Sequence, residues 1–277
     1  MGTLDGKVAF ISGIARGQGR SHALRLASQG ADIIGVDICH DIDTMDYPNA
    51  TSADLAETTK LIEQLDRRVV TSEADVRDFT TVRQAVDSGV AELGRLDIVL
   101  SNAGIVRLHP DADDPAQLWQ DIVGTNMTGG FHVINATVPH LIAGGRGGVI
   151  ILTGSTAGVR PVANPGVGAL AYTASKWGLV GLCKQLAATL AEHSIRVNIV
   201  HPTGVASGMT MNTAMAELAA HAAASTDSSG LAAMQNAMPV QILQPEDISD
   251  TIAFLVSDQA KWITGVSLPV DAGFSVR

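Results

Sequence analysis

Tyr172 and Lys176 stand four residues apart in the run Tyr172-Thr-Ala-Ser-Lys176. On a helix this spacing places a phenol and an ammonium on one face, a single turn apart. A free tyrosine has a pKa of about 10, and a nearby positive charge favours the phenolate and lowers that pKa. The pair therefore indicates a proton-transfer site. Because the spacing also occurs by chance on ordinary helix surfaces, the rest of the chain has to decide.

A glycine-rich turn follows the first apolar run, residues 7–12. Gly13, Gly17 and Gly19 have the spacing Gly-x-x-x-Gly-x-Gly and lead into an amphipathic segment. After a buried strand and before a helix, such glycines let backbone N–H groups and the helix N-terminus approach an anion. We therefore expect a phosphate-binding turn, and a turn without a ligand is the alternative.

A second apolar run, residues 31–36, ends on Asp37. A carboxylate about twenty residues after the glycine turn can accept both hydrogen bonds of an adenosine ribose diol and would repel a 2′-phosphate. Arg16 argues weakly for the opposite preference, because a guanidinium can pair with an extra phosphate. The direct repulsion by Asp37 decides in favour of NAD over NADP, although Asp37 could also be a simple turn residue.

Strand and helix patterns alternate along the rest of the chain. Apolar runs predict strands at 68–74, 96–101, 148–153, 196–201 and 266–270, and helical patterns cover 53–67, 79–93, 115–142, 171–190 and 245–260. Asp114-Pro115 is a typical helix start, and Gly124 and Gly129-Gly130 predict breaks in the helix that follows. Steady alternation without a linker predicts one α/β domain over residues 1–277, a doubly wound parallel sheet of Rossmann type in three α/β/α layers.

Small and polar residues follow the carboxyl ends of these strands, where open α/β sheets bind ligands. Asp75 follows the third strand, and it could equally contact an adenine amino group or cap the next helix. The others are Asn102-Ala103-Gly104 after the fourth strand, Ser155 after the fifth and Pro202-Thr203-Gly204-Val205 after the sixth.

Two segments are longer than the alternation needs. Residues 38–52 show no period and form a loop longer than a strand-to-helix connection requires. Residues 206–238 are rich in alanine and methionine and are interrupted at 225–230, which predicts two helices that form a mobile apolar flap on the substrate side. An ordinary helical hairpin on the core or at a subunit contact is the alternative.

Composition limits the possible partners. The chain has 46% hydrophobic and 17% charged residues and a net charge of −10 without a basic cluster, so nucleic acid is not expected. Its first residues lack the apolar stretch of a secretion signal and no run is long enough to span a membrane, so we expect a soluble, cytoplasmic protein. Cys39 and Cys183 fit neither a disulfide framework nor a metal-ligand spacing, and we expect no metal.

The motifs occur in a recognisable order: Gly13-x-x-x-Gly17-x-Gly19, Asn102-Ala103-Gly104, Asn126, Ser155, Tyr172-x-x-x-Lys176 and Pro202-Thr-Gly-Val205. Together they resemble the short-chain dehydrogenase/reductase family over essentially the whole chain. The resemblance implies a Rossmann-type fold and hydride exchange between a nicotinamide and an alcohol or carbonyl compound.

The family's roles carry over to matching positions. The resemblance implies that Tyr172 is the acid/base, that Ser155 holds the substrate oxygen, and that Lys176 binds the nicotinamide ribose and lowers the tyrosine pKa. Asn126 would position a water in a proton relay, and the Val205 backbone would meet the carboxamide. The implied NAD-binding residues are Gly13, Arg16, Gly17, Gln18, Gly19, Asp37, Asp75, Val76, Asn102, Ala103, Gly104, Tyr172, Lys176, Pro202, Thr203 and Val205.

A narrower resemblance involves Gly17-Gln-Gly-Arg-Ser-His-Ala23, Val36-Asp-Ile-Cys39 and the long loop after them. These look like the carveol-dehydrogenase-like, mycofactocin-associated branch of the family. That branch implies a lipophilic, terpenoid-like secondary alcohol as substrate, tightly bound NAD and a separate mycofactocin-like redox carrier, and the family implies a homotetramer. Tyr172 follows Ser155 at more than the usual family distance, which suggests a bulge over the substrate pocket.

Two other functions are considered beside this one. One is an NADPH-dependent 3-oxoacyl or ketone reductase, which Asp37 disfavours. The other is a non-catalytic NAD-sensing or scaffold protein, and the intact set of Ser155, Tyr172 and Lys176 argues against it because a sensor has no need of an acid/base.

Overall fold

The computed structural model describes residues 2–109, 112–161, 164, 166–224 and 235–277. The strands in these ranges are β1 (Val8–Ser12), β2 (Asp32–Asp37), β3 (Val69–Glu73), β4 (Ile98–Ser101), β5 (Gly148–Thr153), β6 (Ile195–Pro202) and β7 (Ser267–Val270). The α-helices are α1 (Gly17–Ser28), α2 (Ser52–Glu63), α3 (Phe79–Leu93), α4 (Pro115–Val123), α5 (Gly129–Gly144), α6 (Val167–Thr189), α7 (Thr213–Ala224) and α8 (Pro245–Val256).

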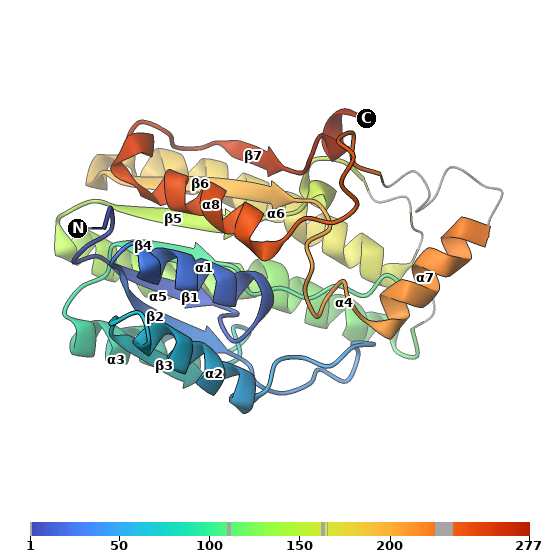
Figure 1. Ribbon diagram of the computed structural model, residues 1–277, viewed down its shortest axis with the longest axis horizontal. Helices are drawn as coiled ribbons and strands as arrows, with labels where there is room; N and C mark the ends of the chain where they lie inside the picture. Colours follow the sequence, from blue (N-terminus) through green and yellow to red (C-terminus); the bar gives the residue numbers. More distant parts are fainter. Residues whose placement is uncertain (1, 110–111, 162–163, 165, 225–234) are drawn as a thin grey trace.

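The described strands form one parallel sheet in the order β3-β2-β1-β4-β5-β6-β7 (Figure 1). The chain winds outward from β1 in one direction and then returns to continue from β4 in the other. This order confirms the predicted doubly wound parallel sheet. It also places the reversal point between β1 and β4, where ligands bind in sheets of this type.

Helices cover both faces of the sheet, as the apolar character of the strands requires. On one face, apolar side chains of α1, α2 and α8 pack on the sheet around Leu26, Ile62 and Ile252. On the other face, α3, α5 and α6 bury residues such as Val86, Val133 and Leu179. The three layers predicted from the sequence are therefore confirmed.

The starts of α3 and α4 follow local capping rules, with one correction. Asp114 accepts a hydrogen bond from the Gln117 amide at 2.9 Å and Pro115 is the first residue of α4, as predicted. The helix after β3 is capped by Asp78, whose carboxylate accepts from the Thr80 amide at 2.8 Å. The capping alternative for Asp75 is therefore wrong, because α3 begins three residues later than that role would require.

The predicted breaks after α4 have a defined form. Gly124–Thr128 is a π-helical turn that joins α4 to α5, and Asn126 lies within it. A Cβ at Gly129 would lie 2.6 Å from a Val76 methyl, so α5 can approach the end of β3 only with glycine there. Other boundaries also differ from the sequence prediction: α2 ends at Glu63 rather than 67, α6 begins at Val167 rather than near 171, and α8 ends at Val256 rather than 260.

The predicted flap is described in part. Its first helix is α7, which lies beyond the carboxyl ends of the strands (Figure 1). The predicted interruption at 225–230 and the first residues of the predicted second helix, 231–234, lie outside the described residues, and residues 235–238 are not helical. Within the described part of the chain, no helix combines the length and apolar character needed to cross a membrane.

Candidate active site

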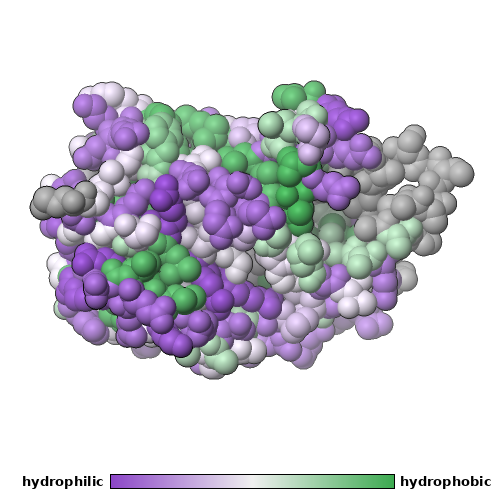
Figure 2. All heavy atoms as spheres, in the orientation of Figure 1, coloured by the Kyte–Doolittle hydropathy of each residue, from purple (hydrophilic) through white to green (hydrophobic). Residues whose placement is uncertain are grey.

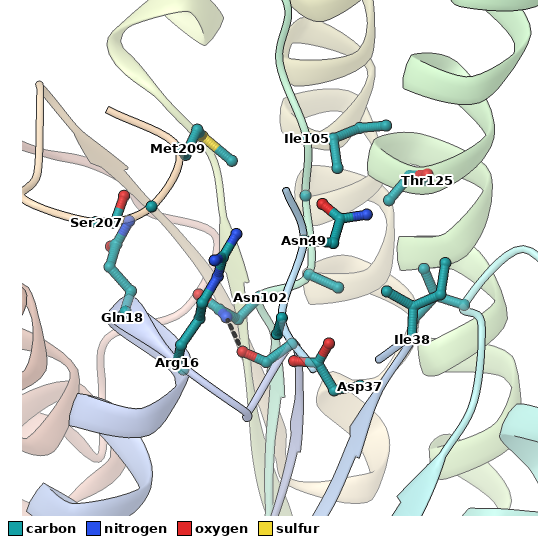
Figure 3. Close-up of a pocket in the computed structure, with 18 of the residues that line it drawn as sticks. Arg16, Gln18, Asp37, Ile38, Asn49, Asn102, Ile105, Thr125, Ser207 and Met209 are labelled. Atoms are coloured by element: carbon teal, nitrogen blue, oxygen red, sulfur yellow. Dashed lines mark hydrogen bonds between the residues drawn. The ribbon is translucent and has the colours of Figure 1, made fainter. Parts of the chain in front are cut away.

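A cavity opens at the carboxyl ends of β1, β2 and β4, at the reversal point of the sheet, with about 880 Å³ of empty space that includes its solvent-open mouth. Figure 3 shows side chains from the turn after β1, the end of β2 and the segment after β4 gathered around it. The sequence predicted many of its lining residues: Gly13, Arg16, Gly17, Gln18, Gly19, Asp37, Asp75, Val76, Asn102, Ala103 and Gly104.

The glycine turn forms one end of the cavity and fits a diphosphate. Gly13 and Gly17 have positive φ values of 71° and 55°, and a Cβ at Gly13 would lie 2.9 Å from the Ala103 backbone. No side chain caps the N-terminus of α1, so its first amides are available to an anion. Among the described residues, Gln18 Oε1 is a buried atom without a hydrogen-bond partner.

Asp37 is a buried carboxylate at the end of β2. Its Oδ2 accepts a hydrogen bond from the Ala15 amide at 2.9 Å, which ties the end of β2 to the glycine turn. Burial raises the pKa of Asp37, and the amides of Ala15, Cys39 and Ile38 and the Arg16 guanidinium act against that rise. These donors do not use every acceptor position of the carboxylate. Asp37 can therefore also accept hydrogen bonds from the diol of a nucleotide ribose, and the site fits such a ribose.

The segment after β4 is anchored to the glycine turn. Ser12 Oγ accepts from the amides of Asn102 at 3.0 Å and Ala103 at 3.1 Å, and the Asn102 side chain donates to the Ser12 carbonyl at 3.0 Å. These bonds close the floor of the cavity. On the neighbouring strand end, Asp75 lines the cavity and pairs with Arg77 at 2.7 Å.

Ser155 and Tyr172 are brought together from different elements. Ser155 follows β5 with extended backbone, and its Oγ accepts a hydrogen bond from the Ala157 amide at 3.1 Å. Tyr172 lies in the first turns of α6. Burial raises the pKa of Tyr172, and a hydrogen bond between its hydroxyl and that of Ser155 lowers it.

Lys176 lies one turn further along α6 and is 3% exposed. Its Nζ donates to the Thr153 carbonyl at 2.8 Å and lies 5.4 Å from the centroid of the Tyr172 ring. The predicted inward face of α6 is confirmed, since Lys176 and Leu179 are both buried. The predicted lowering of the tyrosine pKa by Lys176 is wrong for this structure: burial raises the pKa of Tyr172, and the opposing effect comes from Ser155. Burial also lowers the pKa of Lys176, to about 8.

Asn126 reaches the same group from the π-helical turn. Its Oδ1 accepts from the Ile105 amide at 2.8 Å and its Nδ2 donates to the Ile105 carbonyl at 2.9 Å. A Cβ at Gly104 would lie 3.1 Å from Asn126 Oδ1 and 3.5 Å from Lys176 Nζ. Gly104, Asn126 and Lys176 are therefore immediate neighbours at the inner end of the cavity.

The predicted residues after β6 lie beside the cavity rather than in its lining. Pro202 ends β6, Thr203 Oγ1 donates to Asn236 Oδ1 at 3.0 Å, and Val205 is buried and bridges to Leu243. The segment that follows them does line the cavity. Its members are Ser207, Gly208 and Met209.

The long β2–α2 loop, residues 38–51, was predicted only as a loop, and it covers part of the cavity. Tyr47 is buried, and its hydroxyl accepts from the Val106 amide at 3.2 Å. Arg107 donates to the Thr44 carbonyl at 2.9 Å, and Thr44 donates to Asp121 at 2.8 Å. Loop residues in the lining are Ile38, Ile42, Tyr47, Asn49 and Ala50. The length of the loop was the only sequence signal for this cover.

A crevice that fits a dinucleotide, next to a Ser–Tyr–Lys group, defines a Rossmann-type oxidoreductase. A family model described as short chain dehydrogenase matches residues 7–218, and the chain belongs to this family.

Relatives match the chain along its full length. The chain is similar to (−)-trans-carveol dehydrogenase of Rhodococcus erythropolis, with 41% identity over 100% of both chains. It is 32% identical to (+)-borneol dehydrogenase 1 of Salvia officinalis, covering 99% of this chain and 95% of that protein. A crystal structure of carveol dehydrogenase from Mycobacterium avium in complex with NAD matches with a TM-score of 0.90 and 47% identity over 100% of both chains.

Proposed function

We propose that this chain is an NAD-dependent dehydrogenase that interconverts a lipophilic, terpenoid-like secondary alcohol and its ketone. The observation that carries the proposal is the group formed by Ser155, Tyr172 and the buried Lys176, which lies beside a cavity that fits a dinucleotide. Carveol dehydrogenases and a borneol dehydrogenase among the relatives support the substrate class.

The residues divide the work of alcohol oxidation. Ser155 donates to the substrate oxygen and orients it, and Tyr172 as phenolate accepts the hydroxyl proton. When bound, the nicotinamide accepts the hydride that leaves the same carbon. Lys176, which donates to the Thr153 carbonyl, would bind the nicotinamide ribose, and Asn126 beside it would hold a water that returns the proton to solvent.

Asp37 supports NAD rather than NADP as the nucleotide. Its buried carboxylate stands where the adenosine ribose would lie, and a 2′-phosphate there would bring two negative charges together. Arg16 does not readily turn to pair with a 2′-phosphate, because its guanidinium donates to the Pro48 carbonyl at 2.5 Å. Both features argue against the NADPH-dependent reductase.

The β2–α2 loop supports tight retention of NAD. The loop is fixed by the Tyr47–Val106 hydrogen bond, by Arg107 and by the Thr44–Asp121 hydrogen bond. A nucleotide beneath this cover leaves only after these contacts break. Retained NADH then has to pass its electrons to a second, mycofactocin-like redox carrier at the open side of the site.

Apolar surroundings support a lipophilic substrate. Tyr172 packs against a cluster that joins the β2–α2 loop to α4 and α6: Ile42, Ile105, Leu118, Ile122 and Ala171. Figure 2 shows apolar surface beside the hollow that separates α7 from the body of the molecule on this face. We infer that residues 206–238 act as the substrate-side flap.

Exposed aromatic residues support a homotetramer. Trp119 on α4, Phe131 on α5 and Trp177 on α6 are 42%, 49% and 48% exposed. Large aromatic side chains are typical of subunit contacts. Sedimentation analysis is expected to give four times the chain mass, and a monomer at micromolar concentration would contradict this part of the proposal.

Tyr172→Phe tests the function. The variant is expected to lose at least about 100-fold in turnover of carveol, because phenylalanine cannot accept the proton, while nucleotide binding is retained. Tyr47→Phe is the matched control, since it removes the chain's other phenol, which lines the cavity, and is expected to keep most of the activity. Full turnover by Tyr172→Phe would refute the proposal.

The state of the nucleotide needs a separate experiment. The purified protein is denatured, the released nucleotide is identified, and alcohol oxidation is measured with an artificial dye but without added NAD. Released NAD with dye-coupled turnover is expected. Turnover that depends on added NAD would refute tight retention and leave the dehydrogenase assignment standing.

A further inference from the structure

His201 is a buried imidazole at the carboxyl end of β6, and its ring contacts the main chain of Ser155. β5 and β6 pair through Thr153 and Val200, and the Gly154 amide extends the ladder by donating to the Val200 carbonyl at 2.7 Å. His201 therefore stands beside the segment that carries Ser155 away from the sheet. The roles proposed above do not use it.

The contacts of the ring define its tautomer. His201 Nδ1 lies 2.7 Å from the Ser155 carbonyl oxygen and 3.3 Å from the Ser155 amide nitrogen, and Nε2 lies 2.7 Å from Ser267 Oγ. A neutral imidazole has a single N–H. The shorter contact assigns that hydrogen to Nδ1, which donates to the Ser155 carbonyl, while Nε2 accepts from the Ser267 hydroxyl.

The surroundings of the ring keep it neutral. Burial lowers the pKa of His201, and the hydrogen bond with the Ser155 carbonyl raises it. The charged groups that act on the ring are Lys176 on α6, which lowers its pKa, and Asp271 after β7, which raises it.

Packing leaves the ring no freedom to turn. A Cβ at Gly154 would lie 2.5 Å from His201 Nδ1, and a Cβ at Gly158 would lie 3.2 Å from Cε1. The ring thus contacts the Ser155 segment both before and after the serine, at positions that only glycine leaves open. A displacement of the ring would be transmitted to that segment.

We propose that His201 is a positioning residue for Ser155. By holding the main-chain carbonyl, it fixes the direction from which the Ser155 hydroxyl reaches Tyr172 and the substrate oxygen. Two residues earlier, the Thr153 carbonyl is held by Lys176. The end of β5 is therefore aligned on both sides, and Ser155 meets Tyr172 in a fixed geometry. This inference rests on the proposed function.

Two substitutions at the same position separate positioning from folding. Asparagine keeps an N–H near the place of Nδ1 and can still donate to the Ser155 carbonyl, whereas leucine fills similar space without a donor. His201→Leu is expected to lower kcat for alcohol oxidation by about 10- to 100-fold with NAD affinity unchanged, because small misplacements of an orienting group have effects of this size. His201→Asn is expected to stay within about 3-fold of wild type.

The pH profile adds a readout that a structural role alone would not move. Since the Ser155 hydrogen bond lowers the pKa of Tyr172, loosening Ser155 raises it, and the rise of kcat with pH shifts to higher pH in His201→Leu but not in His201→Asn. Ser267→Ala removes the hydrogen bond to Nε2 and is expected to shift the profile in the same direction by less. It also tests the proposal if the leucine variant does not fold.

Nitrogen NMR of the imidazole tests the geometry without using activity. We expect the Nδ1-protonated tautomer in the wild type and its partial loss in Ser267→Ala. A wild-type ring protonated on Nε2, or a His201→Leu variant with wild-type kcat and pH profile, would overturn the proposal. Because the wild type is assayed in parallel, absence of turnover in all samples would instead count against the proposed function.

Discussion

Replacing Tyr47 by alanine is expected to release bound NAD about 100-fold faster. Tyr47 is 8% exposed, lines the cavity and is the largest buried side chain of the β2–α2 loop. Its hydroxyl also accepts from the Val106 amide, which joins the loop to the segment after β4. These contacts exist only while the loop covers the cavity, so their loss weakens the covered state and leaves the open state unchanged.

The magnitude follows from the truncation of a buried aromatic side chain, which costs about 3–5 kcal/mol. Taking about 3 kcal/mol for a loop that partly relaxes, the opening equilibrium shifts by roughly 100-fold, since each 1.36 kcal/mol is a factor of ten. Release that requires loop opening speeds up by the same factor.

The assay follows the loss of NADH fluorescence when the loaded protein is mixed with excess NAD. Asp43→Ala is the matched control, because Asp43 lies on the same loop with an exposed side chain, and its release rate is expected within about 2-fold of wild type. A wild-type release rate in Tyr47→Ala would refute the retention of the nucleotide by this loop.

Two further predictions concern nucleotide choice and acid stability. In protein freed of its nucleotide, Asp37→Ala is expected to weaken NADH binding by at least about 10-fold, because a charged acceptor for the ribose is lost. The same change is expected to tighten NADPH binding, because a charge that repels the 2′-phosphate is lost. Equal changes in affinity for both nucleotides in fluorescence titrations would contradict this. His22 is buried, with Nδ1 2.8 Å from Ser249 Oγ, and burial lowers its pKa to about 3. The folded state therefore keeps this imidazole neutral, whereas in the unfolded chain it takes up a proton below about pH 6.5. Stability is therefore lost as the pH falls from about 6.5 towards 3, and the Tm of the wild type is expected to drop more over this range than that of His22→Gln; parallel decreases would refute the assignment.

Much of the fold could be predicted because its signals are local. The apolar runs that became β1, β2 and β5 are short, buried and followed by small or polar residues, and Asp114-Pro115 marked the start of α4 unambiguously. The doubly wound order then follows from the alternation of strands and helices. Boundaries were less predictable, since α2 ends four residues early although its helical pattern continues.

The missed parts of the site depend on contacts between distant segments. The loop residues Thr44 and Tyr47 become significant only because Asp121 and Val106 lie opposite them, and no sequence period encodes that approach. His201 looked like the end of a buried strand, and its contact with the Ser155 carbonyl exists only through the pairing of β5 with β6. The two roles considered for Asp75 could likewise be told apart only from the start of α3, which Asp78 caps.

The central claim is that hydride leaves a secondary alcohol for NAD while Tyr172 takes the proton. The most direct measurement uses a terpenoid alcohol such as carveol with deuterium on the carbinol carbon, mixed with the NAD-loaded enzyme, and mass spectrometry of the nucleotide. The account predicts one deuterium in NADH from the wild type and none from Tyr172→Phe in the same time. Unlabelled NADH from the wild type, or equal labelling in the variant, would contradict it.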